Sequence, residues 1–181
     1  MAELLKVENL RAGYGEAVVL QGVSLTLGEG DTLALLGRNG TGKTTFINTL
    51  AGATRQHGGS IWLGAGERRV ALQQVKHLAY GKRRLLEIAI ALACEPRVLL
   101  LDEPVAGVPA GEREELLQTV AALPADVSVL LIEHDMDLVF SFATRMTVLV
   151  NGTVLTEGDP DEIAADPRVK EVYLGEGTTH G

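Results

Sequence analysis

The chain has a single cysteine and no long apolar segment, and both absences limit what it can do. Because Cys94 has no second cysteine to pair with, an internal disulfide is excluded, and a cytoplasmic location fits best. No stretch approaches the about 20 consecutive apolar residues of a membrane-spanning helix. Lys6, Glu8 and Arg11 interrupt the opening residues, so we expect no signal peptide. If the chain serves a membrane, we therefore expect it to do so through a partner.

An excess of positive charge is also absent, since the formal net charge at pH 7 is −8. Such a chain is not expected to wrap nucleic acid through its general electrostatic field, so we expect no nucleic-acid partner. Hydrophobic residues make up 46% and charged residues 22%, which is a globular composition. We find no internal repeat or low-complexity linker, and we expect residues 1–181 to form one domain.

One glycine-rich stretch, residues 37–44, fits the phosphate-binding pattern G-x-x-x-x-G-K-[ST] at every fixed position. Its glycines let the backbone curl tightly, so that many N–H groups can converge on a triphosphate. Lys43 would bring a positive charge to the β- and γ-phosphates, and the Thr44 hydroxyl would ligate Mg²⁺. The residues that we expect to bind the nucleotide here are Gly37, Arg38, Asn39, Gly40, Thr41, Gly42, Lys43, Thr44 and Thr45.

The segments around this loop fit the same interpretation. Residues 32–36 form a short apolar run typical of a buried strand, and residues 45–51 predict a helix closed by Gly52. That helix would direct its N-terminal N–H groups and the positive end of its dipole at the phosphates. A glycine-rich turn that binds nothing is the alternative, but the coincidence of strand, loop and helix counts against it.

Apolar runs and turn signals place the other elements. Glycines break residues 4–10, 17–20 and 23–27 into short strands, which predicts a small antiparallel sheet before the loop. Residues 64–76 show no clear pattern. The remaining elements that we expect are strands at 60–63, 98–101 and 128–132, a loop at 55–59, helices at 82–94, 112–123, 136–143 and 167–173, a hairpin at 145–156, and a helix opened by residues 159–162.

Acidic residues follow two of the buried strands. Asp102 ends one strand where its carboxylate can hold Mg²⁺, directly or through water, and Glu103 is placed to orient and polarise an attacking water. A pair of solvated acids is the alternative interpretation. His134 ends the next buried strand and could donate a hydrogen bond to the γ-phosphate, although a strand-end histidine on its own is more often structural.

These motifs together resemble the nucleotide-binding subunits of ABC transporters: residues 37–44, Leu-Leu-Leu-Asp-Glu-Pro at 99–104 and Glu-His-Asp at 133–135. Within that family, residues 132–139, 156–160 and 166–175 are similar to the ATP-binding subunits of branched-chain amino acid importers. The resemblance covers the whole chain except residues 64–76. It implies an α/β fold with a P-loop NTPase core, in which helices flank a parallel sheet, plus an N-terminal antiparallel β subdomain.

The resemblance also implies further nucleotide contacts. Tyr14 matches the aromatic residue that stacks on adenine, with a core aromatic at a strand end as the alternative. Residues 78–82 align with the family signature Leu-Ser-Gly-Gly-Gln, so that Ala79 and Gly81 would cap the γ-phosphate bound to a second subunit. Ala79 lacks the hydroxyl of the signature serine, and Lys82 replaces the glutamine. Pro109 stands where many relatives carry an aspartate that communicates across the dimer.

The main departure from the family is a short connection between Ile61 and Leu78. Relatives insert several dozen residues there, including a glutamine-bearing loop and a helical subdomain that docks on the transmembrane partner. Gln73 and Gln74 could replace that glutamine, but we favour a polar pair in a connector. Either the chain has lost the helical arm between about residues 64 and 76, or its sequence joins two segments across omitted residues; we favour the second.

The sequence therefore favours an ATP-binding and hydrolysing subunit that powers an importer, with ATP and Mg²⁺ as ligands. The implied partners are transmembrane permease subunits, a second ATP-binding subunit (paralogue or self) in a head-to-tail dimer and, indirectly, a periplasmic or extracellular solute-binding protein. The chain would be cytoplasmic and peripheral on the inner face of the cell membrane. A soluble regulatory or assembly ATPase stays open, as does a P-loop kinase, which would consume ATP only with an acceptor present.

Overall fold

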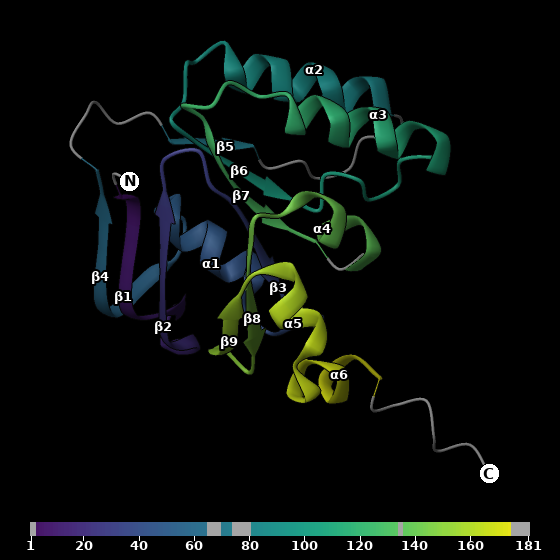
Figure 1. The fold of residues 1–181 in the computed structure, drawn as a ribbon. Coiled ribbons are helices and arrows are strands. Elements are labelled where there is room, and N and C mark those ends of the chain that lie inside the picture. Colours follow the sequence, from purple (N-terminus) through teal and green to yellow (C-terminus); the bar gives the residue numbers. More distant parts are fainter. Residues whose placement is uncertain (1–2, 65–69, 74–80, 134–135, 175–181) are drawn as a thin grey trace.

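The computed structural model describes residues 3–64, 70–73, 81–133 and 136–174, and two β-sheets carry its fold (Figure 1). A three-stranded sheet has the order β2-β1-β4, and a six-stranded core sheet has the order β5-β6-β7-β3-β8-β9. The strands are β1 Glu3–Tyr14, β2 Ala17–Gly28, β3 Thr32–Leu36, β4 Arg55–Leu63, β5 Val70–Gln73, β6 Val98–Asp102, β7 Ser128–Ile132, β8 Arg145–Val150 and β9 Thr153–Gly158. The helices are α1 Lys43–Leu50, α2 Gly81–Leu92, α3 Ala110–Ala121, α4 Met136–Phe142, α5 Pro160–Ala165 and α6 Pro167–Leu174.

The core sheet confirms the predicted α/β architecture. Strands β5, β6, β7, β3 and β8 run parallel, and β9 joins the edge antiparallel to β8 through the predicted turn. The helix after Asp159 begins as expected: the Asp159 side chain accepts from Glu162 N–H, Glu162 completes the capping box, and Pro160 occupies the first turn.

The three-stranded sheet confirms the predicted N-terminal antiparallel subdomain, since β1 pairs antiparallel with both β2 and β4. The prediction of a loop at 55–59 was wrong, because these residues belong to β4. Gly59 has φ 81°, and a Cβ atom there would lie 2.4 Å from the Asn9 carbonyl oxygen. The glycine thus lets two strands approach closely where their register shifts, so a signal typical of a turn instead marks a bulge.

The core sheet is buried on both faces, which explains why its strands are continuously apolar. Along β6, Leu99 and Leu101 pack in a cluster with α2 and α3, which lie side by side over this part of the sheet (Figure 1). Val98 and Leu100 belong to the cluster on the opposite face, which includes Phe46 of α1. Helix α1 contacts strands of both sheets, so the two sheets share one core.

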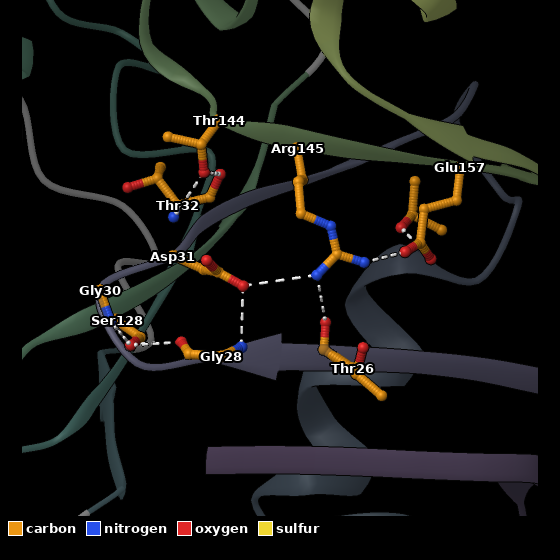
Figure 2. Close-up of polar contacts among 10 residues, drawn as sticks. Thr26, Gly28, Gly30, Asp31, Thr32, Ser128, Thr144, Arg145 and Glu157 are labelled. Atoms are coloured by element: carbon orange, nitrogen blue, oxygen red, sulfur yellow. Dashed lines mark hydrogen bonds and ion pairs between the residues drawn. The ribbon is translucent and has the colours of Figure 1, made fainter. Parts of the chain in front are cut away.

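The two sheets are also joined by a polar network centred on Arg145, the first residue of β8 (Figure 2). Its guanidinium donates to the Thr26 carbonyl oxygen of β2 at 3.3 Å and to the Asp31 carboxylate at 3.4 Å, and it forms an ion pair with Glu157 of β9. Asp31 in turn accepts from Gly28 N–H at 2.8 Å. One cation therefore ties the end of β2 to the amino end of the core sheet.

We expect Arg145→Ala to lower the free energy of unfolding by about 1–2 kcal/mol, because charged hydrogen bonds are lost but partial exposure weakens them. Urea denaturation measures this loss. Arg55→Ala is the matched control: its ion pair with Glu16 joins side chains that are 58% and 85% exposed, so it should change stability little. Equal losses in both variants would contradict the linking role of Arg145.

Candidate nucleotide-binding site

The predicted phosphate loop lies at the carboxyl edge of the core sheet, between β3 and α1. Parallel pairing brings the ends of three strands together there, because Leu35 of β3 and Asp102 of β6 both pair with Ile132 of β7. Ligands of open α/β sheets bind in the crevice outside this edge. The sheet thus aligns the loop with the acidic residues that the sequence singled out.

The loop is curled in the way its glycines permit. Gly40 and Gly42 have φ of 83° and 104°, and Gly42 is the N-cap of α1. The Thr41 hydroxyl donates to the Arg38 carbonyl oxygen at 2.9 Å, and Gly152 N–H donates to the Thr41 carbonyl oxygen at 3.1 Å. The first N–H groups of a helix lack partners within it, so this end of α1 offers donors to an anion.

Lys43 occupies the centre of the loop and is only 5% exposed. Its ammonium donates to the Gly37 carbonyl oxygen at 2.6 Å and to that of Arg38 at 3.0 Å. Burial lowers the pKa of the Lys43 amine, whereas the negative charges of Glu103 and Asp102 oppose this and raise it. Both predicted acids therefore favour the charged form of the lysine, and Glu103 also shares a cleft with it.

A cleft of about 210 Å³ opens beside the ammonium group. Glu103 lines it from the end of β6, together with residues of the loop and of the first turn of α1. Val19 of β2 lines it too, which the sequence did not indicate because Val19 reads as an ordinary strand residue. The residues that line the cleft are Val19, Asn39, Gly40, Gly42, Lys43, Thr44, Thr45 and Glu103.

Glu103 adopts an uncommon backbone conformation, with φ 47°. Non-glycine residues with positive φ are few and often mark functional positions. Its N–H donates to the Ile132 carbonyl oxygen at 2.9 Å, which continues the pairing of β6 with β7 by one residue. This turn carries the Glu103 side chain to the cleft, whereas Asp102 remains the last residue of the strand.

Other predicted site residues lie apart from the cleft or outside the described residues. Tyr14 ends β1, is 51% exposed, and its hydroxyl accepts from the Asn48 amide at 3.1 Å; it is not among the residues lining the cleft. Gly81 is the first residue of α2, as the signature alignment expects of a helix start. His134 and Ala79 lie outside the described residues.

Strand β5 was missed by the sequence analysis, which found no pattern in residues 64–76. Its four residues pair parallel with β6, and Gln73 lies opposite Leu101 at the same carboxyl edge as the cleft. Gln74 lies outside the described residues. Gln73 therefore lies in a strand, and its backbone position is compatible with the alternative that it replaces the glutamine of the family's glutamine-bearing loop.

Family comparisons agree with this geometry. The family model described as "ABC transporter" matches residues 20–70 and 63–106, which include the loop and the two acids. The model described as "Branched-chain amino acid ATP-binding cassette transporter" matches residues 153–178, which include β9, α5 and α6.

Curated relatives extend the similarity along the chain. The chain is 30% identical over 250 residues to the high-affinity branched-chain amino acid transport ATP-binding protein LivG of Salmonella typhimurium, covering 96% of this chain and 98% of the relative. It is 31% identical over 237 residues to the lipopolysaccharide export system ATP-binding protein LptB of Acidithiobacillus ferridurans, with 97% and 98% covered. Both alignments are longer than the 181 residues of the chain, so both relatives hold internal residues without a counterpart here.

Solved structures share the fold. An ATP-binding cassette of an ABC transporter in its ADP conformation superposes with a TM-score of 0.82 at 24% identity, covering 97% of this chain and 100% of that one. A nucleotide-free ATP-binding cassette gives a TM-score of 0.83 at 23% identity, with the same coverage. These matches confirm the predicted P-loop NTPase architecture.

The packing of the loop predicts that alanine destabilises the chain more at Gly37 than at Gly40. A Cβ atom on Gly37 would lie 2.5 Å from Thr41 Oγ1 and 2.6 Å from the Leu149 carbonyl oxygen, whereas one on Gly40 would meet nothing within 4 Å. We expect Gly40→Ala to cost about 1 kcal/mol from backbone strain, and Gly37→Ala at least about 2 kcal/mol more from the added clash. Urea denaturation without nucleotide measures both, and equal costs would contradict the tight packing at Gly37.

Proposed function

Since the chain belongs to the ABC transporter ATP-binding family, whose members hydrolyse ATP, we propose that its cleft between the phosphate loop and β6 binds Mg²⁺·ATP and hydrolyses it to power branched-chain amino acid import. The observation that carries this proposal is the convergence of Lys43, Thr44 and Glu103 on one cleft at the carboxyl edge of the core sheet. A buried cation beside helix N–H groups suits a triphosphate, and a carboxylate on the opposite wall suits the attacking water.

Lys43 is proposed to exchange partners when ATP binds. Its ammonium now donates to two carbonyl oxygens of its own loop, and phosphate oxygens would offer stronger, charged acceptors in the same place. The N–H groups at the start of α1 would add further donors. Residues 37–45 would thereby hold the phosphates, while Glu103 would orient and polarise the water that attacks the γ-phosphate.

The donor set also fits Mg²⁺, which prefers oxygen ligands and one or two carboxylates beside phosphates. Thr44 lines the cleft, and the Asp102 carboxylate is close enough to raise the pKa of Lys43. We propose that these two residues hold the ion, which would neutralise charge on the phosphates. Adenine is proposed to stack on Tyr14, whose 51% exposure leaves the ring accessible.

Further contacts are proposed from the family alone. His134 would steady the γ-phosphate, and residues Ala79 and Gly81 would cap the nucleotide of a second ATP-binding subunit in a head-to-tail dimer. Gly81 supports this in one respect, because it opens α2 and so stands at a helix N-terminus.

Branched-chain amino acids are the proposed solutes because the C-terminal model match and the LivG relative carry that description. LptB, at similar identity, is described as a lipopolysaccharide export protein, so overall identity does not distinguish the solute; the match at residues 153–178 favours amino acids. Within the described part of the chain, no helix has the length and apolarity to cross a membrane. We propose that permease subunits hold the chain at the cytoplasmic face, with a solute-binding protein acting on the other side.

The relatives contain internal residues that this chain lacks. We propose that these residues form the helical arm that docks on the permease. The two segments matched by the ABC transporter model overlap at residues 63–70, which supports a break close to residues 64–76. Within this span, β5 pairs parallel with β6 at the edge of the core sheet.

We expect Glu103→Gln to lower ATP turnover about 10²–10⁴-fold, because the amide cannot accept a proton from water. ATP affinity should stay within about threefold, since the loop that holds the phosphates is untouched. Steady-state phosphate release and equilibrium binding of ATP measure the two effects. Glu114→Gln on the exposed face of α3 is the control. Unchanged hydrolysis would remove Glu103 from this role, and ADP formation only with an added acceptor, without phosphate release, would indicate a kinase.

We expect the tagged chain, expressed in its native cells, to copurify with membrane permease subunits from detergent extracts. Mass spectrometry of the eluate identifies the partners, and a mock purification from untagged cells sets the background. Recovery of no membrane protein above that background would favour the soluble regulatory or assembly ATPase instead.

A further inference from the structure

Two ionisable side chains are fully buried among the residues whose burial is described: Lys43, 5% exposed, and Glu133, 0% exposed. Burying such a group is costly unless partners compensate. The loop carbonyls and the cleft account for Lys43. Glu133 does not line the cleft and has no part in the function proposed above, so its burial calls for a different explanation.

Glu133 directly follows β7 and reaches the loop that carries Glu103. Its Oε1 accepts from Val105 N–H at 3.3 Å, while the preceding residue, Ile132, accepts from Glu103 N–H at 2.9 Å. Pro104, between them, has no N–H group. Residues 103–105 therefore have two backbone donors, and both are bonded to the end of β7. Ile132 accepts one through its carbonyl oxygen, and Glu133 accepts the other through its side chain.

This double attachment matters because Glu103 is held at φ 47°. A non-glycine residue keeps such a sparsely populated conformation only where its surroundings determine it. The attachment also continues along the loop: Ala106 N–H donates to the Glu103 carbonyl oxygen at 3.1 Å, and Val108 N–H donates to that of Val105 at 3.1 Å. Both backbone polar groups of Val105 are thus bonded: its N–H donates to Glu133, and its carbonyl oxygen accepts from Val108.

We propose that Glu133 is a positioning residue for ATP hydrolysis: by fixing Val105 it holds the backbone of Glu103 so that the Glu103 carboxylate faces the cleft. The inference rests on the proposed role of Glu103. This role requires that the side chain of residue 133 is long enough to contact Val105 N–H and carries an acceptor oxygen. Glutamine supplies both without a carboxylate, whereas aspartate keeps the carboxylate but is one methylene too short for Val105 N–H.

The test compares Glu133→Gln with Glu133→Asp. Glu133→Gln should keep turnover within about threefold, whereas Glu133→Asp should lose about tenfold or more, with ATP affinity within about threefold in both. Amide hydrogen exchange of the peptide containing Val105 should quicken in Glu133→Asp and stay near wild type in Glu133→Gln, a readout that does not need turnover. Thr147→Val, which alters another side chain of 0% exposure, controls for disturbing a buried polar residue and should leave turnover unchanged.

A double variant separates positioning from general stability. In the Glu103→Gln background, Glu133→Asp should lower the residual turnover by less than about twofold, because residues that act as a unit are not additive. Retained turnover in Glu133→Asp, loss in Glu133→Gln alone, or full additivity in the double variant would overturn the proposal. If Glu103→Gln itself kept full turnover, the proposed function would fail rather than this inference alone.

Discussion

A buried ammonium group is the constraint that the rest of the site depends on. At 5% exposure, burial lowers the pKa of Lys43, while its own loop supplies two carbonyl acceptors and the charges of Glu103 and Asp102 favour the charged form. The result is a cleft that is lined by Lys43, the loop backbone and the Glu103 carboxylate, and that we propose binds the triphosphate.

The sheet brings the loop and the end of β6 to one edge, where we propose the active site. Parallel pairing of β6 and β3 with β7 fixes which residues reach the common edge, and a one-residue shift would turn each side chain of the strand to the opposite face of the sheet. At the opposite edge, Arg145 joins the antiparallel sheet to the core, while α1 packs between the two. The uncommon backbone conformation of Glu103, with φ 47°, lies beside the cleft.

Much of this could be predicted from the sequence because its signals are local. The loop at residues 37–44 has a fixed spacing, and the strands at 98–101 and 128–132 are continuously apolar because both faces of the sheet are covered. The failures involve contacts between distant residues. Gly59 is typical of a turn, but in the structure it lies at a bulge of β4 next to Asn9. Strand β5 is too short to show a hydrophobic period, and only its pairing with β6 identifies it. Val19 lines the cleft and Glu133 contacts Val105 through tertiary packing, which no spacing in the sequence reveals.

A crystal structure of the chain with Mg²⁺ and a non-hydrolysable ATP analogue tests the central claim most directly. The account predicts the triphosphate in the cleft beside Glu103, with the Lys43 ammonium moved from the Gly37 and Arg38 carbonyl oxygens to phosphate oxygens. A nucleotide bound elsewhere, or a Lys43 that keeps both carbonyl contacts while the analogue is bound, would contradict it.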